Sequence, residues 1–267
     1  MKLDGYILGK DEQPLDVIKD DGGFTSIFRS IAVVGDSLSS GEFEGTNSEG
    51  NKTYRDRFEY SWGQFLARMT GSLVYNFSSG GMTAEWYCNS FADEKGYWSA
   101  DKFCKAYIVA LGVNDIFCQH KPVGDVSDVD LRNYKNNKPT FIGYYSRIIQ
   151  RYKSLNKDAK FFLVVPPESD TQPSEDERTL RSAIYAIAGL FDNTYVLDLY
   201  KYCVTYDKEF RRNFYLGGHL NPMGYALTAK IIGSYIDYII RANPRDFAQV
   251  GFMGSPDRNT SDEFDKQ

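Results

Sequence analysis

The chain has 267 residues, which is long enough for one large α/β domain and short for two. Charged residues make up 25% of the sequence and the net charge is −5, so the clustered Lys and Arg that bind nucleic-acid phosphates are missing. The cysteines are widely spaced without a CxxC pair, which favours free thiols over a zinc site or a disulfide framework.

The first thirty residues are mixed and turn-rich, with Gly22-Gly23 as a clear break. We expect residues 1–30 to form a lead-in that packs on the domain. They lack the apolar core of a signal peptide, and no segment of the chain has the length of a membrane span. As written, the chain is expected to be soluble and cytoplasmic, and secretion is the alternative if a leader has been removed.

The stretch from 31 to 41 combines a short apolar run with a glycine and a serine. Ile31-Ala32-Val33-Val34 shows no polar alternation, which is typical of a parallel strand buried on both faces. If Gly35 ends this strand, Ser37 lies at the carboxyl edge of the sheet, where α/β proteins bind ligands. Ser37 is therefore a candidate nucleophile, and the alternative is a serine that caps the next helix.

A polar loop is predicted from 41 to 60, beside Ser37, and loops of that length are more often functional than filler. A helix is expected over 61–70, with Ser61 as its N-cap. Residues 73–77 predict a second strand, which leads into Gly80-Gly81 before another helix. Backbone N–H groups of such a turn can face the ligand crevice. The alternative for Gly81 is a tight turn that needs a positive φ angle.

The run from 106 to 111 predicts a third strand, and Gly112-Val113-Asn114-Asp115 follows it. The side-chain amide of Asn114 can donate a hydrogen bond to a developing oxyanion. The alternative is an asparagine that stabilises a turn or a cap.

The second half continues the β-α alternation, with strands over 160–165 and 195–198 and helices that start near 140, 174 and 223. This pattern predicts an α/β fold in three layers, with a central parallel sheet of about five strands between helices. We place this domain at residues 31–241 and expect residues 242–267 to form a polar tail. His219 lies in the loop before the final helix, so a core histidine is disfavoured.

Four sequence blocks together resemble the SGNH, or GDSL-type, esterase and lipase family. They are Gly35-Asp36-Ser37-Leu38, Gly81 in an N-x-S-x-x-G-x-T setting, Gly112-x-Asn114-Asp115, and the late His219. Their order and spacing also match, and the resemblance covers roughly residues 30–240. It implies a flavodoxin-like SGNH hydrolase fold.

The resemblance also implies the roles of the site residues. Ser37 would attack an ester carbonyl, and His219 would take its proton and return it to the leaving alcohol. The N–H groups of Ser37 and Gly81 and the side chain of Asn114 would form the oxyanion hole. No metal or organic cofactor is implied, and the expected partner is a small-molecule acyl ester. The oligomeric state is not indicated.

One position departs from the family pattern. The family usually has an aspartate three residues before the histidine, and here that residue is Leu216. Either a backbone carbonyl orients His219, or a carboxylate reaches it from elsewhere, such as Asp198, Asp207 or Glu209. We expect Asp36 to stabilise its own turn rather than to replace the missing acid.

We therefore expect a serine esterase that hydrolyses small acyl esters, with carbohydrate deacetylation as the preferred subclass. Aromatic rings near the expected site can face a sugar ring or a short acyl chain: Tyr54, Phe58, Tyr60, Trp62, Trp86 and Tyr87. The alternatives are a lipase or lysophospholipase, an acyltransferase that shares the same residues, and a binding protein that no longer turns over, since fold alone does not fix function.

Overall fold

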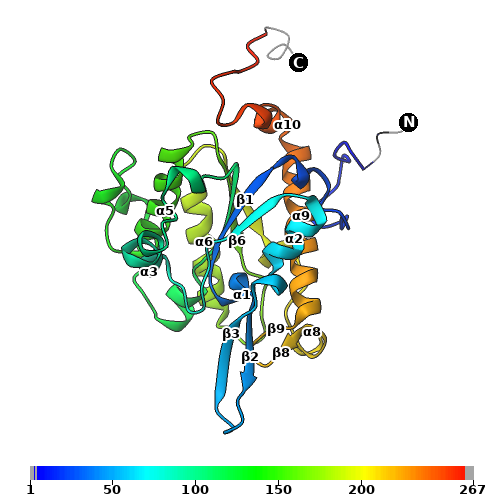
Figure 1. The fold of residues 1–267 in the computed structure, drawn as a ribbon, viewed down its shortest axis with the longest axis vertical. Coiled ribbons are helices and arrows are strands. Elements are labelled where there is room, and N and C mark those ends of the chain that lie inside the picture. The colour runs from blue at the N-terminus through cyan, green and yellow to red at the C-terminus, as the bar shows by residue number, and fades with distance from the viewer. Residues whose placement is uncertain (1–2, 4, 262–267) are drawn as a thin grey trace.

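The computed structural model describes residue 3 and residues 5–261. At its centre lies a five-stranded sheet in which every neighbouring pair of strands is parallel. The strands follow the order β4 (Leu73–Asn76), β1 (Ser30–Gly35), β5 (Ala106–Ala110), β6 (Lys160–Val165) and β7 (Thr194–Asp198). Helices cover both faces of the sheet (Figure 1). The predicted three-layer α/β fold is confirmed.

The helices divide between the two faces and the sheet edge. One face carries α3 (Ala84–Trp86), α4 (Ala92–Glu94), α5 (Phe141–Leu155) and α6 (Ser174–Ala188). The other carries α2 (Trp62–Thr70) and α9 (Pro222–Ala242). In the layer of α2 and α9 also lie residues of α7 (Leu199–Tyr202), α8 (Lys208–Phe214) and α10 (Pro244–Phe247), and α1 (Ser37–Ser40) follows β1. None of the helices in the described residues is both long and apolar enough to cross a bilayer.

Strand β1 shows why the sequence pattern indicated a buried parallel sheet. Ala32 and Val34 pack in the apolar layer that includes α5 and α6, whereas Ile31 and Val33 pack in the layer that includes α2 and α9. Successive side chains of a strand point to opposite faces. Because both faces are covered, the strand is apolar throughout and needs no polar alternation.

Two antiparallel hairpins differ from the expectation of loops. The stretch from 41 to 60 contains β2 (Glu42–Thr46) and β3 (Lys52–Asp56), and the segment before α9 contains β8 (Tyr215–Leu216) and β9 (His219–Leu220). The first hairpin extends away from the body of the molecule (Figure 1), and most of its residues are exposed. With little apolar surface to bury, its strands carry no alternating pattern in the sequence.

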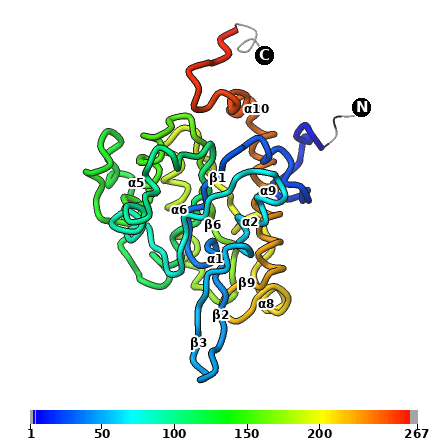
Figure 2. Tube along the Cα trace, in the orientation of Figure 1, coloured from blue at the N-terminus to red at the C-terminus, as the bar shows by residue number. Residues whose placement is uncertain are grey.

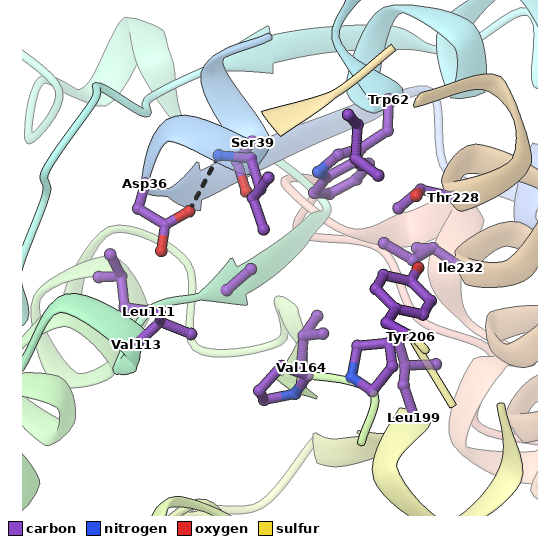
Figure 3. Close-up of a pocket in the computed structure, with 15 residues that line it drawn as sticks. Asp36, Ser39, Trp62, Leu111, Val113, Val164, Leu199, Tyr206, Thr228 and Ile232 are labelled. Carbon is purple, nitrogen blue, oxygen red and sulfur yellow. Dashed lines mark hydrogen bonds between the residues drawn. The ribbon is translucent and has the colours of Figure 1, made fainter. Parts of the chain in front are cut away.

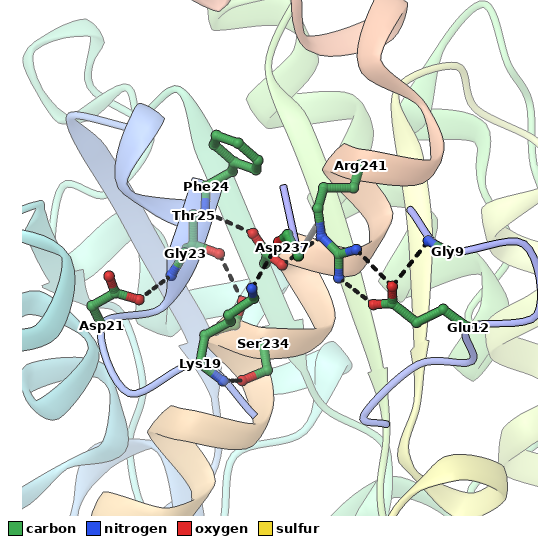
Figure 4. Close-up of polar contacts among 12 residues, drawn as sticks. Gly9, Glu12, Lys19, Asp21, Gly23, Phe24, Thr25, Ser234, Asp237 and Arg241 are labelled. Carbon is green, nitrogen blue, oxygen red and sulfur yellow. Dashed lines mark hydrogen bonds and ion pairs between the residues drawn. The ribbon is translucent and has the colours of Figure 1, made fainter. Parts of the chain in front are cut away.

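The segment before β1 is attached to α9 by a buried polar cluster (Figure 4). The guanidinium of Arg241 donates to Asp237 at 2.8 Å and to both carboxylate oxygens of Glu12 at 3.1 and 2.6 Å. Asp237 also accepts a hydrogen bond from the backbone N–H of Phe24 at 2.8 Å. A side chain at Gly23, whose φ is 54°, would overlap Asp237. Figure 2 shows this segment, in dark blue, beside α9.

The chain after α9 continues to pack against the domain for some way. Phe247, Val250 and Met253 are buried in the same apolar layer as α2 and α9. Residues 262–267 of the expected polar tail lie outside the described residues. The cysteines are free thiols, as expected; those at 88 and 104 are buried, Cys203 is half-buried and Cys118 is exposed.

Candidate active site

Ser37 is the first residue of α1, directly beyond the end of β1. The N-cap of this helix is Asp36, whose Oδ1 accepts a hydrogen bond from the backbone N–H of Leu38 at 3.1 Å. The interpretation of Ser37 as the cap is therefore wrong, and the expected turn-stabilising role of Asp36 is found. A side chain at Gly35 would overlap Ser39, so glycine lets α1 fold back over the strand end. Burial raises the pKa of Asp36 to about 7.

Ser37, Asn114 and His219 line one pocket of about 370 Å³ at the carboxyl edge of the sheet. Among the residues that the structure describes, Gly81 does not line it; Gly81 lies in the turn between β4 and α3 with a φ of 71°. The rest of the wall combines apolar and polar side chains: Phe117, Pro166, Pro167, Tyr206 and Tyr215, then Ser169, Thr171, Gln172, Glu177 and Arg211. The structure thus brings three of the four predicted site residues to one pocket.

Two hydrogen bonds join the segment that carries Asn114 to the end of the turn after β4 and to the first residue of α3. The Nδ2 of Asn114 donates to the backbone carbonyl of Met82 at 3.1 Å. The fully buried carboxylate of Asp115 accepts from the N–H of Ala84 at 3.0 Å, and burial raises the pKa of Asp115 to about 7. An amide nitrogen carries two hydrogens, so the bond to Met82 fixes the direction of Asn114 and leaves one hydrogen for a ligand.

His219 is the first residue of β9 in the second hairpin, and its imidazole contacts residues of the first hairpin. Its side chain is 15% exposed, and its Nε2 lies 3.1 Å from Oε1 of Glu42 on β2. The ring of Tyr54 packs edge-on against the imidazole, with a centroid separation of 5.9 Å. Nδ1 is buried and has no hydrogen-bond partner among the described residues. Burial lowers the pKa of His219 from its ordinary value, and the carboxylates of Glu44 and Asp56 partly oppose this. Burial therefore favours the neutral imidazole.

The carboxylates suggested by the sequence as partners of His219 are engaged elsewhere or exposed. Asp198 is fully buried and accepts from Arg181 at 2.7 Å and from Tyr185 at 2.8 Å. Asp207 caps α8 by accepting from the N–H of Phe210 at 2.9 Å, and Glu209 is exposed.

The carboxylate that contacts the imidazole instead is Glu42, which the sequence analysis missed. Its one sequence signal was its place in the polar stretch after Ser37. Leu216, at the usual aspartate position, is 53% exposed.

The aromatic residues expected around the site are mostly elsewhere. Tyr54 contacts His219, but Trp62 and Tyr87 are core residues. The others are exposed at 40–45%: Phe58, Tyr60 and Trp86. None of these rings is part of the Ser37 pocket as the described residues form it.

A second pocket, of about 80 Å³, lies beside the first and is almost entirely apolar (Figure 3). Asp36, Leu38 and Tyr206 belong to the walls of both pockets, as do Val113, Pro166 and Pro167. The second pocket extends inward between the sheet and the layer of α2 and α9, where Trp62 and Ile232 close it. A larger pocket of mixed character and a small apolar pocket thus share a wall next to the nucleophile candidate.

The parallel sheet between two helical layers, with a pocket at its carboxyl edge, agrees with the SGNH hydrolase fold that the four sequence blocks imply. Residues 33–227 match the family model described as GDSL-like Lipase/Acylhydrolase, and the chain belongs to this family. No curated protein sequence matches the chain.

Similar solved structures include three family two carbohydrate esterases. One, from Clostridium thermocellum in complex with cellohexaose, has a TM-score of 0.56 and 15% identity over 79% of this chain and 64% of that one. The enzyme from Corynascus thermopiles (Myceliophthora fergusii), which also has a carbohydrate binding domain, has a TM-score of 0.55 and 17% identity over 79% and 66%. The enzyme from Cellvibrio japonicus has a TM-score of 0.54 and 17% identity over 79% and 61%. The chain thus spans less than two thirds of each of these proteins, and the likeness shows the fold.

Proposed function

We propose that the protein is a serine esterase for small acyl esters, with Ser37 as the nucleophile and His219 as the general base and acid. The observation that carries the proposal is the pocket that both residues line, in a chain of the GDSL-like acylhydrolase family. A serine hydroxyl is a weak nucleophile unless a neighbouring base removes its proton. Burial lowers the pKa of His219 and favours the neutral imidazole, which is the form that accepts a proton.

In the proposed reaction, Oγ of Ser37 attacks the ester carbonyl carbon while His219 takes the hydroxyl proton. The negative oxygen that develops is met by the N–H groups of Ser37 and Gly81 and by the amide of Asn114. The intermediate collapses, the C–O bond to the alcohol breaks, and His219 returns the proton to the leaving alcohol. Water then attacks the acyl-enzyme by the same proton transfers and releases the acid. No step needs a metal or an organic cofactor.

Polar side chains in the pocket wall support a carbohydrate ester as the substrate. Gln172, Glu177 and Arg211 belong to this wall, and side chains of these types bond to sugar hydroxyls. The carbohydrate esterases of similar fold agree with this choice. The adjoining apolar pocket favours a second candidate, an acylhydrolase for longer chains, because it can receive an acyl tail. An acyltransferase would use the same residues, with an alcohol in place of water.

A panel of acyl esters tests the proposal. We expect turnover of p-nitrophenyl acetate and of acetylated sugars, with rates that fall from acetate to butyrate to octanoate. A fluorophosphonate probe is expected to label Ser37, as peptide mass spectrometry would show. A preference for octanoate would select the long-chain candidate. If the folded protein hydrolyses none of these esters and resists the probe, the chain is a binding protein.

The pH profile provides a second test, because the base must be neutral to accept the proton of Ser37. Burial lowers the pKa of His219 from 6.5, so the neutral form persists to lower pH than for an exposed histidine. We expect the acid limb of kcat/KM for p-nitrophenyl acetate to have its midpoint below pH 6.5, the ordinary value for a histidine. An acid limb centred above pH 7 would contradict the assignment of His219 as the base.

A further inference from the structure

We infer that Glu42 is the positioning carboxylate of the proposed Ser37–His219 pair, in place of the aspartate that Leu216 replaces. The inference rests on the proposed function and assigns the group that holds the base. It follows from the contacts of the Glu42 carboxylate and from the contacts between the two hairpins. It also uses the different surroundings of the two imidazole nitrogens of His219.

The contact between Glu42 and His219 is shielded from water. Oε1 of Glu42 lies 3.1 Å from Nε2 of His219, and each side chain is only 15% exposed. Pairs on the open surface are screened and contribute little, whereas pairs removed from water interact more strongly. This contact can therefore hold the ring in one orientation.

The carboxylate of Glu42 fits closely between the turn after β4 and the imidazole. A side chain at Gly80 would overlap the second carboxylate oxygen, so that oxygen lies against the glycine backbone. The hydroxyl of Tyr225 on α9 donates to the backbone carbonyl of Glu42 at 2.7 Å. The side chain and the backbone of Glu42 are thus both constrained, and its carboxylate lies beside two segments of the proposed machinery.

The hairpin that carries Glu42 also fixes the turn before His219. Glu44, two residues further along β2, accepts from the N–H of Gly218 at 3.0 Å and contacts Lys52 at 2.7 Å. Residues two apart on a strand share a face, so Glu42 and Glu44 both face β9. Phe43 lies between them and packs against other aromatic rings. One strand therefore positions both the histidine and its loop.

The inference also assigns the imidazole nitrogen that acts as the base. In this proposal Nε2 carries the proton that faces the carboxylate, and Nδ1 has the lone pair. Nδ1 is buried and bonds to none of the described residues, and the proposal assigns it to the proton of Ser37. Once the ring is protonated, the charge of Glu42 stabilises the imidazolium, as the acid of a serine triad does.

Glu42→Gln tests the inference, with Glu49→Gln at the exposed tip of the same hairpin as the matched control. We expect kcat for p-nitrophenyl acetate to fall by about 10²–10⁴-fold with KM nearly unchanged. Burial and the neighbouring Asp56 raise the pKa of Glu42. Where Glu42 is ionised, its removal disfavours the imidazolium, so the acid limb of the pH profile should also move to lower pH. Glu44 and Asp56 remain near His219 in this variant, so the limb should shift without vanishing. Glu49→Gln should match the wild type.

Glu42→Asp keeps the charge on a shorter side chain and should recover part of the lost kcat, which a packing defect would not predict. Circular dichroism melts of each variant establish that it is folded, and if Glu42→Gln fails to fold, the kcat and acid limb of Glu42→Asp decide. Wild-type kcat and an unmoved acid limb in a folded Glu42→Gln would overturn the role of Glu42 alone. Undiminished activity in Ser37→Ala would instead overturn the proposed function.

Discussion

Ser37→Ala is expected to lose ester hydrolysis by about 10⁴-fold or more. The substitution removes the oxygen that forms the acyl-enzyme, and the residual rate comes from the oxyanion donors and from substrate binding. Ser37 begins α1 at the edge of the pocket, so the loss of one hydroxyl should not disturb the fold. Initial rates on p-nitrophenyl acetate, with circular dichroism on the same samples, measure the effect.

His219→Ala should lose activity to a similar extent, and the double variant should be no worse than either single one. Residues that act as one unit give such non-additive losses, because removing either partner already disables the step. Ser48→Ala on the exposed hairpin and His120→Asn at the other, exposed histidine serve as matched controls. Asparagine tolerates the positive φ of 47° at His120. More than a tenth of the wild-type rate in Ser37→Ala would refute the nucleophile.

Asp237→Ala should destabilise the protein by about 3 kcal/mol, because it breaks a buried ion pair and leaves polar groups without partners. Arg241 would keep Glu12 but lose its bond to Asp237, and the N–H of Phe24 would lose its acceptor. Asp237 is 1% exposed, so water cannot readily replace the missing carboxylate. The shift in the urea unfolding midpoint at constant slope gives the change in free energy.

The matched control is Asp20→Asn, which removes a second contact between the lead-in and α9. Asp20 lies 2.7 Å from Lys230, but its side chain is 88% exposed. Exposed pairs of this kind are screened by water and salt, so no measurable change in the unfolding midpoint is expected. Equal effects of the two substitutions would show that burial does not govern the attachment of this segment.

The sequence predicted the sheet well because its strands are covered on both faces. The apolar run of β1 could form only a buried strand, and Ser37 followed from its position after that strand. His219 was found from its place before the last helix, through the family resemblance. The pocket that they share depends on the carboxyl edge of a parallel sheet, a general property of α/β folds.

The hairpin and the partner of His219 could not be predicted in the same way. β2 and β3 are mostly exposed, so no apolar alternation separates them from a loop. The approach of Glu42 to His219 depends on two hairpins that meet only in the folded protein, and no local pattern encodes it. The oxyanion roles of Ser37, Gly81 and Asn114 stay predictions.

The buried cluster of Glu12, Asp237 and Arg241 bears on how the protein is made in the cell. During synthesis the lead-in emerges before the rest of the domain, but its partners on α9 lie near residue 240. Until α9 has left the ribosome, Glu12 and the N–H of Phe24 have only water as a partner, and the apolar face that α9 covers stays open. Completion of the fold therefore waits for the synthesis of α9, and a nascent chain that stops before α9 would expose that face to chaperones or to aggregation.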